Sequence, residues 1–594
     1  MILGKHINKY YLKFLPILLL GAIALIAVDL FQMKVPEAYR IVVNGLTYGV
    51  VDIDGETLPF NWDVALKYVF LPLLVVAGVM IVGRFAWRMC FLGTSARVEK
   101  SLRRSMFDKC KDLSANFYQT NKVGSLMSYF TNDIDTIQDC FGWGVMMLMD
   151  ALFLGGLSIY KMASMDWKLA LLSLIPVVFM LTSSIVVGVY LSKKWDERQE
   201  AFSKISDFAQ ESFSGFAVIK AFVKEAKELS AFKRLNKDNE KINVQFTKLS
   251  TLLNVSITLF VNSVVCIVLG YGGYLVYKGK FNAGQLVEFL GYFNAIVWPV
   301  LSISDLIDMH SRGKASLKRV GKLLDEQADV VDREGAEVIE NVKGKIEFRD
   351  LTFRYPGANY DALSHVSFVI NAGENVGIVG KTGSGKSTVA ELLLRVFNVE
   401  DGTIFVDDKD VNDITIDSLR NNFAYVPQDN FLFGDTIAEN IAFASDSKDR
   451  ESVVKYARLS DIDKDIEEFR ERYDTMLGER GVTVSGGQKQ RISIARAFMK
   501  EAAVTILDDS VSAVDTRTES IILGSIKSTR KGRTTILVSH RVLTVKDMDK
   551  IILLDEGKVI GVGTHEYLYE NVEEYRNMVE LQKLDDEKEE KGNE

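Results

Sequence analysis

The chain has 594 residues, of which 48% are hydrophobic, 25% are charged and only 8 are proline, so it is long enough for several domains. Its 71 basic and 79 acidic residues give a net charge of −8. This balance excludes a globally basic nucleic-acid-binding protein, so we expect no nucleic-acid partner. The four cysteines have neither metal-binding nor redox spacing and are expected to be ordinary reduced residues.

Six apolar segments in the first half of the chain are long enough to cross a bilayer, which takes about 20 residues. They cover approximately residues 14–33, 65–89, 142–160, 169–191, 252–277 and 285–307. The first follows Lys5, Lys9 and Lys13 and has no small-residue cleavage site, so we interpret it as a retained span rather than a signal peptide. We therefore predict an α-helical membrane domain over residues 1–310.

The connections between the spans differ in charge. Residues 34–64 are modestly charged and acidic, whereas residues 94–141 and 192–251 are rich in Lys and Arg. The positive-inside rule therefore places the N-terminus, both basic connections and the C-terminal half in the cytoplasm. The basic connections contain little Pro or Gly, so we expect the spans to continue as helices, and a hairpin of about 55 residues would project roughly 40 Å.

Polar side chains within the spans are the local clue to a substrate. Asp29, Arg84, Asp150 and Asn262 would be costly facing lipid, so they are expected to face the helix bundle or a wet cavity. Carboxylates among aromatic residues such as Trp298 would suit an amphipathic cation. Pairing of an Asp with Arg84 inside the membrane is an equally good interpretation.

Residues 345–584 have the composition of a soluble α/β domain, with a linker at residues 311–344 and a charged, partly disordered tail at residues 585–594. In this domain a Gly-x4-Gly-Lys-Ser phosphate loop follows an apolar run and precedes a helix, so backbone N–H groups and the helix N-terminus would bind the phosphates of ATP. The expected binding residues are Gly380, Lys381, Thr382, Gly383, Ser384, Gly385, Lys386, Ser387 and Thr388.

Two carboxylates complete the expected chemistry of this site. Lys386 would reach the β- and γ-phosphates, and the Ser387 hydroxyl and the Asp508 carboxylate would hold Mg²⁺. Asp508 ends a second buried strand and is followed by Asp509, where a hydrolysing site of this type usually carries Glu. Asp509 would polarise the attacking water, but its side chain is one methylene shorter. The sequence thus predicts ATP binding and leaves brisk hydrolysis in doubt.

A second motif, made of Ser485, Gly486, Gly487 and Gln488, opens a helix with small residues, which is itself an anion-binding arrangement. Together with the phosphate loop it resembles the signature of the ABC transporter ATPase family. Six spans ahead of the ATPase resemble the exporter type of that family. The expected fold is a bundle of six transmembrane helices followed by an α/β P-loop ATPase domain with a mixed sheet and a helical subdomain.

The resemblance extends residue by residue through the C-terminal half. It implies that Tyr355 stacks on adenine, that Gln428 contacts Mg²⁺ and faces the membrane domain, and that His540 is the switch histidine. Residues 475–481 are similar to the segment that exporters place before the signature, and residues 512–515 look like the loop that crosses to the partner. The expected catalytic residues are Asp509, His540 and Gln428.

Two cytosolic segments, residues 121–128 and 214–222, are similar to the coupling-helix regions of these exporters. A short apolar helix in each would press into the ATPase surface beside Gln428. The alternative is an ordinary cytosolic helical hairpin.

In this family each signature closes over the phosphate loop of a second ATPase domain, and this chain has one set of motifs. The resemblance therefore implies a dimer in a bacterial plasma membrane. Asp509 favours a heterodimer, with a different half-transporter that carries the Glu. ATP would close the two ATPase domains and open the cavity outward, because its affinity differs between the two states. The expected substrate is a small amphipathic compound such as a drug.

Two other classes of function stay open. The chain would be a chiefly regulatory ATP-binding subunit if its own site never turns over, which Asp509 supports and the intact Gln428 and His540 oppose. It would be a lipid flippase or a peptide exporter if the same scaffold serves another substrate. No peptidase-like segment precedes the first span, so coupled leader-peptide removal is not expected.

Overall fold

The computed structural model describes residues 4–53, 55–445, 449–478, 481, 483–511 and 516–592. The chain divides into two compact units. The first contains Met1–Lys111 and Val123–Glu326, and the second contains Asp112–Lys122 and Gln327–Glu594. Each unit has a hydrophobic core of its own.

The first unit consists of long helices, short helical pieces and one β-hairpin. The long helices are α2 (Leu15–Gln32), α3 (Lys34–Tyr48), α5 (Leu71–Asp112), α8 (Ile134–Met165), α9 (Trp167–Ser214), α11 (Glu225–Ile267) and α13 (Ala283–Asp325). The short elements are α1 (Asn8–Lys13), β1 (Val50–Ile53), β2 (Glu56–Pro59), α4 (Trp62–Ala65), α7 (Val123–Ser128), α10 (Phe216–Ala221) and α12 (Gly273–Tyr277). Three π-helical turns continue neighbouring helices into longer rods, at Leu66–Phe70, Tyr129–Asp133 and Val268–Gly272.

Among the described residues, six helical rods are long and apolar enough to cross a membrane. They are Leu15–Tyr48, Trp62–Asp112, Val123–Met165, Trp167–Ser214, Glu225–Tyr277 and Ala283–Asp325. The six predicted spans are therefore confirmed. The rods are longer than the spans because the charged connections are helical too, as predicted. The 43 residues of α11, for example, extend about 64 Å.

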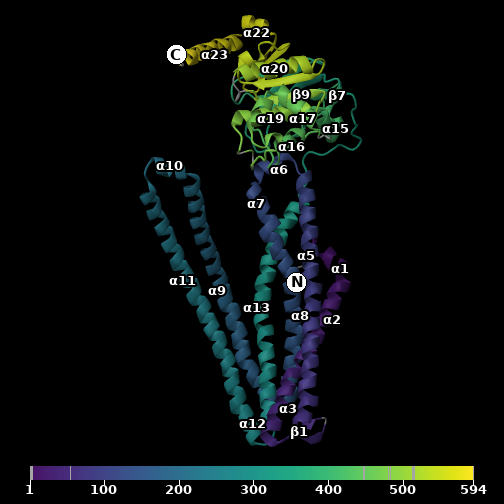
Figure 1. The fold of residues 1–594 in the computed structure, drawn as a ribbon, viewed down its shortest axis with the longest axis vertical. Helices are drawn as coiled ribbons and strands as arrows, with labels where there is room; N and C mark the ends of the chain where they lie inside the picture. The colour runs from purple at the N-terminus through teal and green to yellow at the C-terminus, as the bar shows by residue number, and fades with distance from the viewer. Residues whose placement is uncertain are drawn as a thin grey trace. The chain divides into compact units, whose positions relative to one another are not determined.

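Helix α13 is central to the first unit. It packs along α8 and α3, and its buried Phe289 and Phe293 join Leu154 of α8 and Val264 of α11 in one apolar cluster. Helices α9 and α11 lie side by side as a hairpin closed by α10, and Figure 1 shows this hairpin diverging from α8 and α13 toward α10. Many apolar side chains of α9 and α11 stay exposed, as expected for helices that meet lipid or another subunit.

Part of the expected linker and part of the expected tail are helical. The first part of the expected linker, residues 311–325, continues α13, because Leu317, Val320 and Leu323 are buried at helical spacing. At the other end, α23 (Glu573–Gly592) keeps a helical backbone to residue 592, where we expected a partly disordered tail. The Glu and Lys residues of this tail are good helix formers, so a helix is consistent with its composition.

The first expected coupling segment, residues 121–128, is divided between the units. Helix α7 continues through a π-helical turn into α8 and belongs to the first unit. The second unit instead takes in Asp112–Lys122, which contains α6 (Ala115–Thr120). Within that unit, the Asn116 amide donates to Asp329 Oδ2 at 2.8 Å and the Ser114 hydroxyl donates to the same oxygen at 3.3 Å. The segment that joins the second unit, residues 112–122, thus shares only residues 121 and 122 with the expected one and extends upstream of it.

The second unit contains two sheets with helices around them. A six-stranded sheet has the order β12-β11-β5-β10-β9-β8, with β12 antiparallel to β11 and the other pairs parallel. Its strands are β5 (Asn375–Val379), β8 (Phe423–Val426), β9 (Val504–Asp508), β10 (Thr534–Ser539), β11 (Lys550–Asp555) and β12 (Lys558–Gly563). A four-stranded antiparallel sheet contains β3 (Ile346–Phe353), β4 (Leu363–Ile370), β6 (Ile404–Val406) and β7 (Lys409–Asp410).

The helices of the second unit, besides α6 and α23, follow individual strands or form a helical subdomain between β8 and β9. They are α14 (Lys386–Leu393), α15 (Ile416–Asn421), α16 (Ile437–Ala442), α17 (Arg450–Leu459), α18 (Asp463–Glu468), α19 (Gly486–Met499), α20 (Thr516–Thr529), α21 (Val542–Val545) and α22 (His565–Asn571). The predicted combination of a mixed sheet and a helical subdomain is therefore confirmed.

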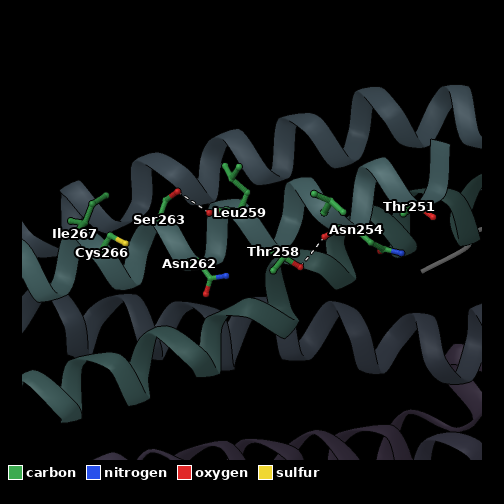
Figure 2. A pocket seen from close by; sticks show the side chains of 9 residues that line it. Thr251, Asn254, Thr258, Leu259, Asn262, Ser263, Cys266 and Ile267 are labelled. Carbon is green, nitrogen blue, oxygen red and sulfur yellow. Dashed lines mark hydrogen bonds between the residues drawn. The ribbon is translucent and has the colours of Figure 1, made fainter. Parts of the chain in front are cut away.

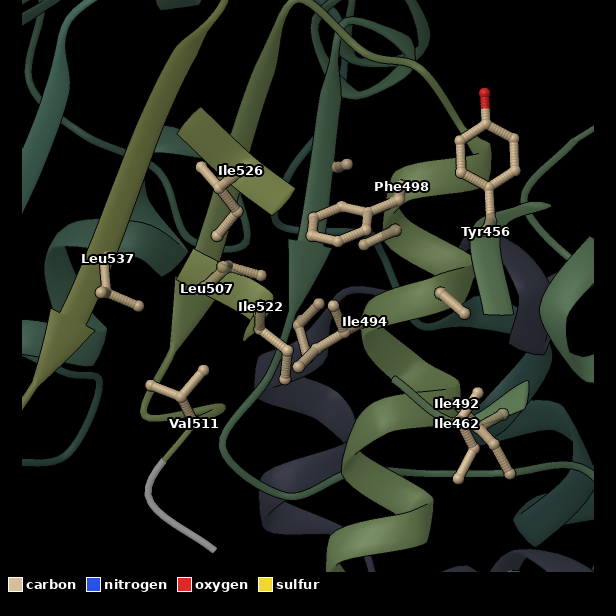
Figure 3. Packing of buried hydrophobic residues seen from close by; sticks show 14 of the residues in the cluster. Tyr456, Ile462, Ile492, Ile494, Phe498, Leu507, Val511, Ile522, Ile526 and Leu537 are labelled. Atoms are coloured by element: carbon tan, nitrogen blue, oxygen red, sulfur yellow. The ribbon is translucent and has the colours of Figure 1, made fainter. Parts of the chain in front are cut away.

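The six-stranded sheet separates two cores, because successive side chains of each strand point to opposite faces. In β9, Ile506 packs with the antiparallel sheet and α14, whereas Leu507 packs with the helical subdomain. Figure 3 shows Ile494 and Phe498 of α19 pointing toward Leu507 and toward Ile522 of α20. This packing fixes α19, and with it the signature at its N-terminus, to the sheet.

Candidate nucleotide-binding site

The predicted site residues follow four neighbouring parallel strands at their carboxyl ends. Strand register aligns Val379 with Ser539, Val538 with Asp508, and Val426 with Leu507. The phosphate loop, His540, Asp509 and Gln428 follow these strand ends directly in the sequence. Because parallel strands end at the same edge of a sheet, residues far apart in the chain meet there, which is the usual binding position in such folds.

The glycines of the phosphate loop are required by its close packing. A Cβ on Gly380 would lie 2.1 Å from the Leu554 carbonyl oxygen. Gly385 has φ +93°, which favours glycine, and its Cβ would lie 2.6 Å from Leu363 Cδ2. The loop therefore passes too close to β4 and β11 for larger residues, and α14 begins directly after it.

Lys386 folds back over the loop. Its Nζ donates to the carbonyl oxygens of Gly380 and Lys381 at 2.8 and 2.7 Å. Burial lowers the pKa of Lys386 from its ordinary value, against the opposing charges of Asp509 and Asp508. Ser384 in the same loop is 2% exposed, and its Oγ has no hydrogen-bond partner among the described residues. The loop thus holds a cation, which suits a phosphate group, whereas the Ser384 hydroxyl is buried beneath it.

Asp508 and Ser387 form a pair of hard oxygen ligands. The Ser387 hydroxyl donates to Asp508 Oδ1 at 3.1 Å, and the Tyr425 hydroxyl donates to Oδ2 at 3.4 Å. Asp508 is 1% exposed, and burial raises its pKa although both hydrogen bonds oppose the shift. Mg²⁺ prefers oxygen ligands and takes only one or two from the protein beside phosphate and water. This donor set therefore fits Mg²⁺ bound together with a nucleotide.

Asp509 is held in an uncommon conformation. Its φ is +46°, its backbone N–H donates to the Val538 carbonyl oxygen at 2.9 Å, and its own carbonyl oxygen accepts from Gln490 Nε2 at 3.2 Å. Its carboxylate Oδ1 lies 2.9 Å from Nδ1 of His540, which is hydrogen-bond distance. The two residues expected to act on water and the γ-phosphate are therefore bonded to each other.

A cleft of about 470 Å³ connects these groups. The predicted residues that line it are Tyr355, Thr382, Gly383, Gly385, Lys386, Ser387, Thr388, Gln428, Asp508, Asp509 and His540. Gly380, Lys381 and Ser384 belong to the same loop, but their side-chain positions do not line the cleft. The structure thus brings together the phosphate loop and the residues that the sequence placed around it.

The cleft contains two tyrosines. Tyr355 is anchored, because its hydroxyl lies 2.9 Å from Thr388 Oγ1 and donates to Glu391 Oε2 at 2.7 Å. Its ring packs edge-on against Phe397, with a centroid distance of 5.2 Å. Tyr360 also lines the cleft and is 74% exposed, but sequence reasoning did not select it. The signal that was available is a second aromatic residue five positions after Tyr355.

The signature does not line the cleft. Ser485 is the N-cap of α19 and forms a capping box with Gln488, in which each side chain bonds the backbone N–H of the other residue. Apart from its chain neighbours and the backbone of its own helix, no described atom would lie within 4 Å of a Cβ on Gly486. Residues 512–515, and residues 479 and 480 of the segment before the signature, lie outside the described residues.

A separate hollow of about 680 Å³ lies along α11 in the first unit. Figure 2 shows its lining, which comes from one helix between Thr251 and Ile267. The Thr258 and Ser263 hydroxyls donate to carbonyl oxygens of their own helix at 2.9 and 2.7 Å. The amide of Asn262 is exposed on this face. Asn262, the polar residue singled out in the fifth span, thus faces open space in the single chain.

Comparison with known proteins assigns both units to families. Residues 18–300 match the family described as ABC transporter transmembrane region, and residues 363–512 match the family described as ABC transporter. The chain belongs to the ABC transporter family. It is 33% identical over 584 residues to the probable multidrug resistance ABC transporter ATP-binding/permease protein YheI of Bacillus subtilis, with 98% of this chain and 97% of that protein covered.

Two further relatives show the range of the family. The chain is 31% identical over 573 residues to the ATP-dependent lipid A-core flippase of Syntrophus aciditrophicus, covering 94% of each protein. Its fold is similar to the solved structure of a bacterial Atm1-family ABC exporter with ATP bound, with a TM-score of 0.74, 25% identity and 97% and 98% of the two chains covered.

The predicted family, fold and location are therefore confirmed. This ABC exporter chain is a half-transporter, with one membrane domain and one ATPase domain, and a multi-pass protein of the plasma membrane with a cytoplasmic ATPase. Its ATPase domain binds ATP and couples hydrolysis to transport. The roles of individual site residues and the identity of the second half stay predictions.

Proposed function

We propose that this chain is one half of a heterodimeric exporter of amphipathic compounds, in which its own ATP site is degenerate and its signature completes the partner's hydrolytic site. The observation that carries the proposal is the hydrogen bond of 2.9 Å between Asp509 and His540. A general base must reach the water that it activates. The Asp509 side chain is one methylene shorter than Glu and is already engaged by the imidazole, so it is poorly placed to do so.

The same site would still hold nucleotide. Lys386 and the backbone of the phosphate loop would bind the β- and γ-phosphates, and Tyr355 or Tyr360 would contact the adenine. Ser387 and Asp508, with Gln428 beside them, would hold Mg²⁺. When bound, Mg²⁺ neutralises charge on the phosphate oxygens. In a slow site, bound ATP acts mainly to keep two ATPase domains closed, since it is bound differently in the open and closed states.

The geometry around Gly486 supports action on a second polypeptide. Among the described residues, apart from its chain neighbours and the backbone of its own helix, no atom lies within 4 Å of the position of its Cβ, so the described packing does not require glycine there. The N-terminus of α19 is capped by Ser485 and anchored through its core side chains, which leaves the following N–H groups in an ordered anion-binding position. The proposed ligand is the γ-phosphate of ATP on the partner's phosphate loop.

Features of the first unit also support the proposal of a partner subunit. The hollow along α11 is lined by one helix and carries the exposed amide of Asn262. Such an amide is costly in lipid and is better placed against another helix or a wet pathway. A second membrane domain would close this hollow, and the pathway for an amphipathic substrate would then pass beside α11.

The names of the relatives suggest more than one class of substrate. Several relatives are called multidrug transporters, and one is called a lipid A-core flippase. The multidrug names favour a small amphipathic compound. A lipid flippase, a peptide exporter and a chiefly regulatory subunit are the competing proposals. Substrate-stimulated ATPase activity in proteoliposomes, screened with drugs, lipids and peptides, separates the first three.

Asp509→Glu in the chain purified alone tests the degenerate site. If the wild-type chain self-associates, two sites that lack the Glu should hydrolyse ATP slowly, and Asp509→Glu should raise the rate about tenfold or more. Asp555→Glu, at the carboxylate that ends β11, is the matched control and should leave the rate unchanged. Brisk hydrolysis by the wild-type chain alone would contradict the proposal.

A further inference from the structure

Four polar side chains of the membrane unit come from four different helices, and one of them, Asp29, is buried. The members of this group are Asp29 of α2, Arg84 of α5, Asp150 of α8 and Trp298 of α13. The helices pack closely beside these residues. A Cβ on Gly83 would lie 2.5 Å from Val28 Cγ2, so α5 touches α2 there. A Cβ on Gly155 would lie 3.4 Å from Pro299 Cβ, so α8 touches α13 one turn beyond Asp150.

The carboxylates of this group are incompletely paired. Asp29 is 3% exposed, and its Oδ2 has no hydrogen-bond partner among the described residues. Asp150 Oδ2 accepts from Trp298 Nε1 at 3.3 Å. Among the described residues, Arg84 donates to Gln32 Oε1, at 3.4 Å, rather than to a carboxylate. The group therefore contains two carboxyl groups and one guanidinium, and the charges of Asp150 and Arg84 both act on Asp29.

We propose that Asp29 and Asp150, with the indole of Trp298, recognise the positively charged group of an amphipathic organic cation. This inference rests on the proposed export of amphipathic compounds and assigns the charge class of the substrate. An unpaired carboxylate in the membrane interior is costly, and a monovalent cation would remove that cost. The Trp298 side chain is 48% exposed, so its ring offers a face for a cation–π contact.

An organic cation fits this group better than a metal ion. Among the described residues, no cluster of three or more His, Cys, Asp or Glu side chains has the arrangement of a metal site. Asp29 is fourteen residues after Leu15, so it lies roughly 21 Å along α2, within the thickness of the bilayer core.

Binding of two ions of equal shape and opposite charge tests the site. The assembled transporter in lipid nanodiscs is titrated with radiolabelled tetraphenylphosphonium and, separately, with tetraphenylborate, after subtraction of empty nanodiscs. Asp29→Asn and Asp150→Asn should each weaken binding of the cation tenfold or more and leave binding of the anion unchanged or tighter. Asp150→Glu should restore cation binding to within about threefold. Asp305→Asn, at another carboxylate of α13, is the matched control and should change neither.

Trp298 gives a test that changes no charge. Trp298→Ala should weaken cation binding roughly three- to tenfold, since it removes the ring, whereas Trp298→Phe keeps a ring and should have a smaller effect. These two variants replace the Asn variants if the latter do not insert, which size-exclusion chromatography and ATP binding reveal. Equal loss for both ions, or no loss for the cation, would overturn the inference.

The outcomes also separate this inference from the proposed function. If neutral or anionic amphipaths stimulate ATPase activity in wild type while tetraphenylphosphonium does not bind, the cation site is wrong and amphipath export stands. If no amphipath of any charge binds or stimulates, both are wrong. A loss of cation binding confined to the Asp29, Asp150 and Trp298 variants supports the inference.

Discussion

The cleft and the signature lie in the same ATPase domain but differ in how completely the chain satisfies them. In the cleft, Lys386, Asp508 and Asp509 all bond to groups of their own chain. At the signature, the Ser485 hydroxyl accepts from the Gln488 N–H and caps α19, but the described residues leave the space beside Gly486 open. This difference is what the proposed heterodimer requires, since there the cleft would bind this chain's own ATP and the signature would act on the ATP of the partner.

Gly486→Asp should have the largest effect. A carboxylate at this position would fill the open space and repel the partner's γ-phosphate, so steady-state ATPase activity of the assembled dimer should fall by roughly two orders of magnitude. Gly524→Asp is the matched control, because Gly524 in α20 also has no atom within 4 Å of its Cβ position. A mild effect of Gly486→Asp would place the signature outside the hydrolytic site.

Val218→Asp should stop transport without unfolding the chain. Val218 lies on α10 and is 60% exposed, so a charge there costs the single chain little but would oppose docking on an apolar surface. The variant should insert, dimerise and bind ATP, with substrate efflux reduced about tenfold or more. Leu584→Asp, at an exposed apolar residue of α23, is the control. Wild-type transport by Val218→Asp would exclude α10 as a coupling helix.

Lys386→Ala should weaken ATP binding at this chain's own site. The Nζ contributes charge-assisted hydrogen bonds to the phosphates, so affinity should fall about 10- to 100-fold. Photolabelling with 8-azido-ATP, followed by separation of the two chains, assigns the loss to this chain. Lys381→Ala, which removes an exposed side chain of the same loop, should cost much less.

Tyr355→Ala should have a smaller effect on the same measurement. Loss of a ring contact to adenine costs about 1 kcal/mol, or about fivefold in ATP affinity. Tyr360→Ala decides which tyrosine carries the contact, since Tyr355 is held by Thr388 and Glu391 and Tyr360 is exposed. Unchanged ATP affinity in both variants would mean that neither tyrosine ring contacts the adenine.

Much of this arrangement was predictable because the motifs are local. The spacing of residues 380–387 identifies a loop between strand and helix, and the strand before Asp508 places that carboxylate at the same sheet edge. Hydropathy was equally sufficient for the six spans, since a bilayer requires long apolar helices.

The contacts between distant residues were not predictable. The hydrogen bond between Asp509 and His540 depends on the register of β9 with β10 and on the positive φ of Asp509. Neither can be predicted from the sequence. The same is true of Asp29, whose Oδ2 lacks a hydrogen-bond partner among the described residues because of how α2, α5 and α8 pack. The position of α6 was missed because its six residues carry no periodic pattern.

Asp509→Asn, measured beside Gly486→Asp, tests the division of labour most directly. The steady-state ATPase rate of the purified, assembled dimer is compared for wild type and the two variants of this chain, with ATP cleavage in a single turnover assigned to each site. The account predicts that Asp509→Asn keeps the rate within about twofold of wild type, because this carboxylate does not reach the water, while Gly486→Asp nearly abolishes it. If Asp509→Asn silences the dimer and Gly486→Asp is mild, the degenerate site and the heterodimer inferred from it are both wrong.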